Sequence, residues 1–240
     1  MTDVRTRSRP NLTRERILTE AARIFNRLGY HGTALDDVAQ ALGVTKAALY
    51  YHVHGKEELL FQCCKVPIEI GLEGIRRARS EARAPDEQLR LALARYIEGV
   101  TDQLRGSVVI LEEGTLSPAH YREVKDGRDA YERELREIIA RGVAEGVFVP
   151  CDPRVTGFAI LGAMNWIPKW YRPDRGRSGP EIAEAFASYL VRGLMRDPTV
   201  KRAARRPRGG GGRRGGGHPG EHRRVLPRAR NEGGMTAARP

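Results

Sequence analysis

The stretch from Thr33 to Lys56 constrains the fold of this chain more than any other. Apolar residues recur at helical spacing in its first half: Leu35, Val38, Ala39 and Leu42. Gly43 follows where the end of a helix favours a positive φ, which glycine adopts at the least cost. A second short helix is expected from Thr45 to His52. Two short helices joined by such a turn predict a helix-turn-helix, whose second helix enters the DNA major groove by its N-terminal residues.

This stretch and the residues around it resemble the DNA-binding domain of TetR-family transcription regulators. The residues that carry the resemblance are Ile17, Ala21, Phe25, Gly29, Tyr30, Thr33, Val38, Ala39, Gly43, Val44, Leu49, Tyr50, Tyr51, His52, Lys56, Glu57, Glu58 and Leu59. Two positions depart from the commonest pattern, with Val53 where phenylalanine is usual and Gly55 where serine usually caps the next helix. We therefore expect that helix to begin less firmly than it would after a serine.

Helical periodicity continues through most of the chain, and no alternating strand pattern with turns interrupts it, which predicts an all-α fold. The expected helices span residues 12–28, 33–42, 45–52, 56–79, 85–104, 118–146, 153–171 and 180–194. Thr33 and Asp36 match a capping box at the second helix, while Ser117 and Asp152 precede prolines that suit a first helical turn. Pro67 is expected to kink the fourth helix, and Pro168 the one over residues 153–171.

Composition and periodicity together divide the chain into four parts. We expect a flexible arm over residues 1–10, a helix-turn-helix domain over 11–57, a helical bundle over 58–198 and a disordered Arg/Gly-rich tail over 199–240. The resemblance implies that the bundle over 58–198 is the ligand-binding and dimerisation domain. Residues 201–240 carry 12 basic and 2 acidic groups, a net of +10 out of the total of +12. The basic total is therefore a weak argument for DNA binding. Both ends are open to two interpretations, a solvated segment or a contact with DNA phosphates or the minor groove.

The cysteines and the apolar runs favour a cytoplasmic protein without a membrane partner. Cys63, Cys64 and Cys151 have no C-x-x-C spacing and fit reduced thiols better than a disulfide framework. No apolar run approaches the ~20 residues that cross a bilayer, and nothing near Met1 has the pattern of a signal peptide.

Contacts with double-stranded DNA are expected from the helix-turn-helix. Lys46 can bond guanine O6 and N7, Ala47 can touch a thymine methyl, and Thr33 can meet a phosphate. The resemblance implies phosphate and base contacts at Thr33, Thr45, Lys46, Tyr50, Tyr51, His52 and Lys56. Tyr50 fits a core position equally well. A metal site at His52 and His54 is not expected, because residues two apart on a helix do not face each other.

Residues 60–196 contain no nucleophile–base pair, glycine-rich phosphate loop or metal-ligand spacing, so we expect no catalytic residues, cofactor or metal. Residues 165–173 resemble the W-Y-R-P stretch of a TetR subgroup that represses fatty-acid or sterol-ring breakdown and responds to acyl-CoA thioesters. The resemblance implies ligand contacts from Trp166, Lys169, Trp170 and Arg172, with aromatic walls for an acyl chain and cations for the CoA phosphates. Alternatively, these aromatic residues anchor the bundle.

Small residues on the last two expected helices allow close helix packing: Gly157, Gly162, Ala163, Ala183, Ala187 and Gly193. They fit a core within one subunit or, as the resemblance implies, a four-helix interface between two subunits. Two half-sites about 34 Å apart require a twofold partner, which favours a homodimer. The expected function is a repressor that binds a palindromic operator and is released by a small hydrophobic effector. The alternatives are a sequence-independent architectural DNA-binding protein and a small helical enzyme acting on thioesters.

Overall fold

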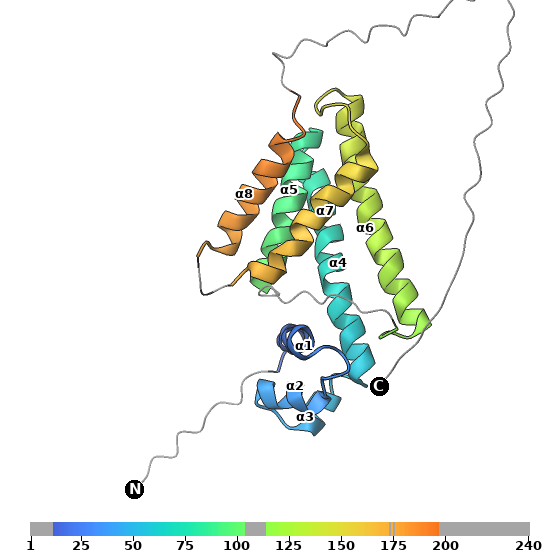
Figure 1. Ribbon diagram of the computed structural model, residues 1–240, viewed down its shortest axis with the longest axis vertical. Helices are drawn as coiled ribbons and strands as arrows, with labels where there is room; N and C mark the ends of the chain where they lie inside the picture. Colours follow the sequence, from blue (N-terminus) through green and yellow to red (C-terminus); the bar gives the residue numbers. More distant parts are fainter. Residues whose placement is uncertain (1–11, 104–113, 173, 175, 197–240) are drawn as a thin grey trace, which may run out of the picture. The chain divides into compact units, whose positions relative to one another are not determined.

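The computed structural model describes residues 12–103, 114–172, 174 and 176–196, and these residues form helices without any β-strand (Figure 1). The helices are α1 (Arg14–Leu28), α2 (Leu35–Leu42), α3 (Lys46–Tyr50), α4 (Lys56–Glu81), α5 (Pro85–Glu98), α6 (Pro118–Ala144), α7 (Pro153–Trp170) and α8 (Gly179–Arg192), with a π-helical turn (Gly99–Gln103) after α5. The predicted all-α fold is confirmed. The predicted arm over residues 1–10, the apolar run of residues 108–111 and the predicted tail over 199–240 lie outside the described residues.

Short polar side chains begin several of these helices by bonding backbone N–H groups that have no partner within the helix. Thr45 Oγ1 accepts from the backbone N of Ala48 at the start of α3. The predicted caps of α6 and α7 are confirmed, since Ser117 and Asp152 accept from backbone N–H groups of the following turn. Gly55 caps α4 without any side-chain bond, as its missing side chain requires.

The predicted capping box of Thr33 with Asp36 is wrong by one residue. Ala34 is the N-cap of α2, and the Asp37 carboxylate accepts from its backbone N at 2.7 Å. Thr33 is only 2% exposed, and its hydroxyl donates to the Gly29 carbonyl at 2.7 Å. Gly29 ends α1 with a φ of +72°, so the turn folds Thr33 back onto the end of α1 before α2 begins.

Several helix ends differ from the prediction by a few residues. α1 begins at Arg14 rather than at residue 12, and α3 is limited to Lys46–Tyr50. α5 ends at Glu98 and passes into the π-helical turn, where the buried Thr101 hydroxyl donates to the Ile97 carbonyl at 2.8 Å. α4 runs without interruption through Pro67, and the predicted kink stays a prediction.

Two clusters of buried apolar side chains form the interior, and α4 contributes to both. The first joins α1, α2 and α3 to the beginning of α4, where Leu59, Leu60 and Phe61 are buried, and it also includes Leu116 just before α6 and Val124 within it. The second joins α5, α6, α7 and α8 to the later part of α4, where Ile75 and Ala78 are buried. The helix α4 therefore runs from the helix-turn-helix core into the bundle core, and the beginning of α6 packs beside its first half (Figure 1).

The end of α6 depends on a close approach between Gly142 and Phe148. Gly146 has a φ of +74°, which turns the chain back so that the Gly142 carbonyl accepts from the backbone N of Val147 and of Phe148. A Cβ at Gly142 would lie 2.1 Å from the Phe148 ring, which is fully buried.

We expect Gly142→Ala to lower the free energy of unfolding by about 1–3 kcal/mol, because the added methyl overpacks the core against Phe148. Helix propensity alone would give the opposite sign, since alanine is the better helix former. The matched control is Ala140→Gly at an exposed position of α6, with an expected loss of about 0.5–1 kcal/mol from propensity alone. Urea unfolding measures both, and a Gly142→Ala protein as stable as the wild type would contradict this packing.

Candidate DNA-binding surface and ligand cavity

The helix α3 exposes the side on which the sequence places most of the DNA contacts. Leu49 is 0% exposed and anchors α3 in the first core, so the opposite side faces solvent. The predicted contact residues on that side and just beyond it are all exposed: Thr45, Lys46, Ala47, Tyr50, Tyr51 and His52. Tyr51 is 86% exposed, and Tyr50 is exposed rather than part of the core. An exposed face of this composition is what a helix entering a groove requires.

Lys46 forms an ion pair with Asp36 of α2 in the absence of DNA. Its Nζ lies 2.9 Å from Asp36 Oδ1 and 3.0 Å from Oδ2. The hydrogen bond to Asp36 raises the pKa of Lys46, with a further contribution from the charge of that carboxylate. Both side chains are well exposed, so the pair contributes little to stability and is easily exchanged for another partner.

Two of the predicted phosphate contacts have partners inside the domain. Thr33 is buried, and its backbone N donates to the Tyr30 carbonyl while its hydroxyl is bonded to Gly29, so its side chain is not placed to meet a phosphate. Lys56 Nζ donates to the carbonyls of Tyr30 and Thr33 at 3.0 and 2.9 Å and lies over the Tyr30 ring. It therefore ties the start of α4 to the α1–α2 turn, with one ammonium proton left for DNA.

Glu57, the next residue, connects α4 to the start of α6. Its carboxylate accepts from the Ser117 backbone N at 2.8 Å and bonds His120 Nδ1 at 2.8 Å. The His120 ring stacks on Phe61, with ring centroids 3.9 Å apart. Sequence analysis missed this joint, because no local pattern relates residues 63 positions apart. Burial pushes the pKa of Glu57 up, but the bonds from Ser117 and His120 outweigh it, so the pKa lies below its ordinary value.

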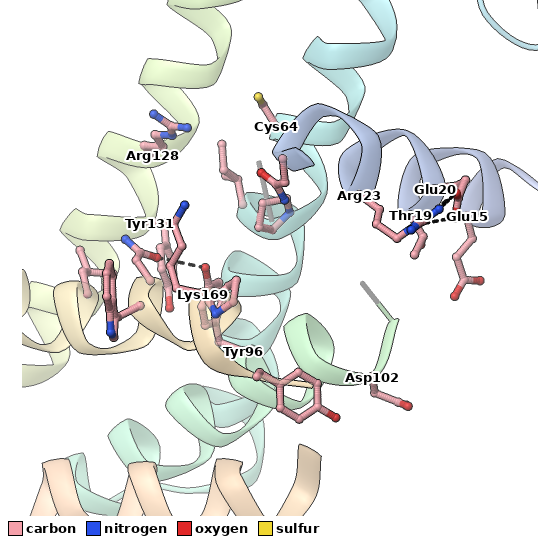
Figure 2. A pocket seen from close by; sticks show the side chains of 18 of the residues that line it. Glu15, Thr19, Glu20, Arg23, Cys64, Tyr96, Asp102, Arg128, Tyr131 and Lys169 are labelled. Atoms are coloured by element: carbon pink, nitrogen blue, oxygen red, sulfur yellow. Dashed lines mark hydrogen bonds and ion pairs between the residues drawn. The ribbon is translucent and has the colours of Figure 1, made fainter. Parts of the chain in front are cut away.

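A cavity of about 1670 Å³ that is open to solvent lies among the helices α1, α2, α4, α5, α6 and α7 (Figure 2). Its volume exceeds the ~300–1,000 Å³ of common ligand pockets, so it has room for a ligand as large as a nucleotide cofactor. Three of the four predicted ligand contacts, Trp166, Lys169 and Arg172, line it. Trp170 does not line it and instead stacks on Phe186 of α8, with centroids 5.9 Å apart, so the anchoring alternative describes Trp170 better.

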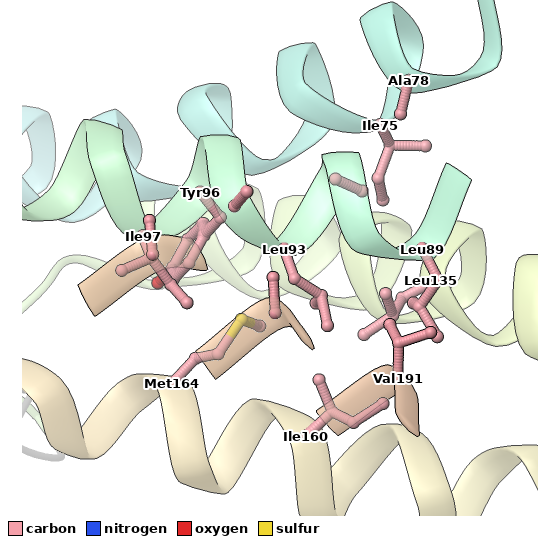
Figure 3. Close-up of a cluster of buried hydrophobic side chains, with 14 of the residues drawn as sticks. Ile75, Ala78, Leu89, Leu93, Tyr96, Ile97, Leu135, Ile160, Met164 and Val191 are labelled. Atoms are coloured by element: carbon pink, nitrogen blue, oxygen red, sulfur yellow. The ribbon is translucent and has the colours of Figure 1, made fainter. Parts of the chain in front are cut away.

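Two stacked tyrosines stand between this cavity and the bundle core. Tyr96 of α5 and Tyr131 of α6 have ring centroids 5.6 Å apart, and both line the cavity (Figure 2). Figure 3 shows Tyr96 beside Ile97 and near Met164 among the apolar side chains of the core. The Tyr96 hydroxyl donates to Asn165 Oδ1 of α7 at 3.4 Å. Burial raises the pKa of Tyr96 to about 12 and that of Tyr131 well above its ordinary value, so both stay protonated.

The described residues provide neither a metal site nor a membrane-spanning helix. No group of three or more His, Cys, Asp or Glu side chains is placed to hold a metal ion in this part of the chain. Within the same ranges, no helix combines the length and the apolar content that crossing a bilayer demands.

We expect the Glu57 joint to weaken in acid. The pKa of Glu57 is lower in the folded protein than in the unfolded chain, where it lies near 4.5. The Glu57 carboxylate therefore contributes its full stabilisation above pH 4.5, and this stabilisation is lost as the pH falls through the lower pKa of the folded protein. Glu57→Gln should cost roughly 1 kcal/mol of unfolding free energy at pH 7, and this difference from the wild type should shrink below pH 4.5. Glu69→Gln, at an exposed position of α4, is the control and should differ little at any pH. A cost for Glu57→Gln that does not vary with pH would contradict the role of its charge.

Family profiles match both parts of the chain. Residues 17–63 match the model described as bacterial regulatory proteins, tetR family, and residues 82–194 match the model described as tetracyclin repressor-like, C-terminal domain. Together they cover the exposed helix α3 and the cavity-lining parts of α5, α6 and α7, whereas the cavity-lining residues of α4 lie between the two matches.

Solved structures and characterised proteins agree with these profiles. The crystal structure of the TetR-family regulator PfmR from Thermus thermophilus is 35% identical, with a TM-score of 0.64, over 75% of this chain and 100% of that one. AibR in complex with isovaleryl coenzyme A and operator DNA is 30% identical, with a TM-score of 0.61, over 75% and 98% of the two chains. The transcriptional activator FasR of Mycolicibacterium smegmatis is 26% identical over 78% of this chain and 85% of its own.

All of these proteins are transcription regulators rather than enzymes, which confirms the prediction of a DNA-binding regulator and argues against the alternative of a thioester enzyme. The chain belongs to the TetR family of bacterial transcriptional regulators.

Proposed function

We propose that this protein is a homodimeric repressor that binds a palindromic operator and is released from it by an acyl-CoA thioester. The observation that carries the proposal is the double role of α4. Its first turns pack in the helix-turn-helix core, its later turns pack in the bundle core, and Cys64, Pro67 and Ile68 between them line the cavity. A ligand in the cavity therefore contacts α4, the helix that packs against α3 and its DNA-binding face.

On the operator, the exposed side of α3 enters the major groove. Lys46 exchanges Asp36 for guanine O6 and N7, and Ala47 contacts a thymine methyl. Thr45, Tyr50, Tyr51 and His52 surround these two residues and meet phosphates and base edges. Lys56 adds one N–H at the start of α4. Thr33 supports the turn and is left out of the proposed contacts.

A twofold partner is supported by apolar side chains that α7 and α8 leave exposed away from the cavity: Val155, Trp170 and Tyr189. Tyr189 is 80% exposed although it lies on the same helix as the buried Ile182 and Ala187. Large aromatic side chains are enriched at protein interfaces. We propose that a second copy of the chain covers this face, which places two copies of α3 against two half-sites.

The acyl-CoA effector is supported by the chemistry of the cavity. Phe158, Leu161 and Trp166 offer apolar and aromatic walls to an acyl chain. Arg128, Lys169 and Arg172 also line the cavity, and cations of this kind form strong charge-assisted bonds with phosphate oxygens. AibR, whose structure contains isovaleryl coenzyme A, is a precedent for this ligand class in a similar chain.

Release is a shift between two conformers. The effector weakens operator binding only if it binds the released conformer more tightly than the DNA-competent one, and the operator weakens effector binding by the same factor. A hundredfold loss of operator affinity corresponds to about 2.7 kcal/mol of coupling. Lys56 and Glu57 connect the DNA-binding domain to the bundle. Lys56 bonds the α1–α2 turn, and the adjacent Glu57 bonds the start of α6.

We expect isovaleryl-CoA and longer acyl-CoAs to raise the melting temperature, because a ligand that binds only the folded protein stabilises it. They should also weaken operator binding at least tenfold, because they favour the released conformer. Thermal shift and fluorescence anisotropy on an operator duplex measure the two effects, with free CoA as the ligand control. Lys169→Ala should weaken thioester binding without changing operator affinity in the absence of ligand. Saturable thioester binding that leaves operator affinity unchanged would refute the release mechanism, and equally tight binding of shuffled DNA would favour the architectural alternative.

We expect Lys46→Ala to reduce base preference about tenfold at one operator position. The melting temperature should stay unchanged, because Lys46 is exposed. Lys56→Ala should weaken all sequences alike and should also lower the melting temperature, since its ammonium bonds two carbonyls of the turn. Lys125→Ala, exposed on α6, is the charge-matched control. Anisotropy titrations against single-base operator variants measure both effects. Identical affinity profiles for Lys46→Ala and Lys56→Ala would contradict the assignment of base reading to Lys46 and phosphate contact to Lys56.

A further inference from the structure

The Tyr131 hydroxyl is a buried polar group that has no partner among the described residues. Tyr131 is 7% exposed, and its hydroxyl oxygen makes no hydrogen bond with them. Most buried hydroxyls are paired, because leaving one unpaired costs the hydrogen bonds that it would make with water. The neighbouring Tyr96 differs, since its hydroxyl is bonded to Asn165. Tyr131 therefore holds an unused donor at the wall of the cavity.

The Tyr131 ring also packs directly on the backbone of α4. A Cβ at Gly71 would lie 2.8 Å from Cε2 and 2.9 Å from Cζ of this ring. Only a glycine on α4 allows the ring to come so close. The hydroxyl oxygen itself is closed to solvent, so a ligand reaches it only when the Tyr131 side chain or a group packed against it moves.

The surroundings favour an uncharged acceptor for this donor. Burial raises the pKa of Tyr131, so the hydroxyl stays protonated and can donate a hydrogen bond. It does not act as a charged phenolate acceptor. The Tyr96 ring stacks on one side of it. A carbonyl oxygen satisfies the hydroxyl without bringing a charge into this desolvated place, whereas a carboxylate would need a cation beside it. The exposed Arg128, one turn earlier on α6, is better placed for a ligand group nearer the solvent.

We propose that the Tyr131 hydroxyl donates to the acyl carbonyl of the effector, and that reaching it separates Tyr131 from Gly71 and so displaces α4. This inference rests on the proposed thioester effector. It adds the atom that recognises the thioester and the contact through which binding reaches the DNA-binding domain.

The test of the carbonyl uses three probes: isovaleryl-CoA, its thioether analogue S-isopentyl-CoA, and free isovalerate. Calorimetric titration of the full chain should show the thioester binding at least tenfold tighter than the thioether, as expected for a bond of about 1.4 kcal/mol. In Tyr131→Phe the thioester should fall to the affinity of the thioether. The ligand-free melting temperature of Tyr131→Phe should equal or exceed that of the wild type, because no hydrogen bond is lost.

The outcomes separate this inference from the proposed function. If neither CoA compound binds the wild type, the thioester effector is refuted and the inference falls with it. If both bind with equal affinity, or if Tyr131→Phe still prefers the thioester, the effector class stands and the role of Tyr131 is refuted. Isovalerate binding as tightly as the thioester would assign the hydroxyl to a carboxylate instead and overturn the carbonyl.

The test of the α4 contact uses glycines one turn apart. Gly71→Ala forces the ring and α4 apart and should weaken operator binding at least tenfold without ligand. Gly74→Ala is the matched control, because its Cβ would lie 3.4 Å from Arg95 Cβ, close to an ordinary contact. If Gly71→Ala weakens the fold, the double variant with Tyr131→Ala relieves the clash and should restore operator affinity. Wild-type operator affinity in folded Gly71→Ala, or no rescue in the double variant, would overturn the coupling.

Discussion

The packing of α4 into two hydrophobic cores is the constraint on which the rest of the structure depends. Leu59 and Leu60 belong to the core of the helix-turn-helix, and Ile75 and Ala78 belong to the core of the bundle. Because protein interiors are close-packed, neither end of the helix can shift without repacking its own cluster. Lys56 and Glu57 add polar bonds at the junction, one toward the α1–α2 turn and one toward α6. In the proposed mechanism, a change at the cavity wall reaches α3 as a rigid-body displacement of α4.

Local chemistry made much of the fold predictable. Gly43 has the expected positive φ of 68°, and Thr45, Ser117 and Asp152 cap the helices that they precede. These features depend on neighbours within four residues, which a sequence displays directly. The error at Thr33 has the same origin. The capping-box pattern selects Thr33, whose hydroxyl could accept, whereas the close return of the chain after Gly29 directs that hydroxyl to the Gly29 carbonyl and leaves Ala34 as the N-cap.

The cavity was predicted less completely, because its chemistry depends on helices far apart in sequence. Tyr96 and Tyr131 are both buried, but nothing in the sequence distinguishes the paired hydroxyl of Tyr96 from the unpaired one of Tyr131. The joint between Glu57 and His120 joins residues that no local pattern relates. A short resemblance identified Trp166, Lys169 and Arg172 on the cavity wall, yet it could not tell that Trp170 faces Phe186.

In the proposed operator complex, the ion pair between Lys46 and Asp36 would limit how selective Lys46 can be toward its base. On a duplex that offers no acceptor at the right position, the Lys46 ammonium keeps a partner, because it can pair with the Asp36 carboxylate on α2. The penalty for a mismatched base is then the difference between two modest interactions rather than the full cost of an orphaned cation. Because Asp36 can take back the ammonium, operator binding in the proposed complex would tolerate a different base at that position. One regulator could then bind several promoters whose operator sequences differ there.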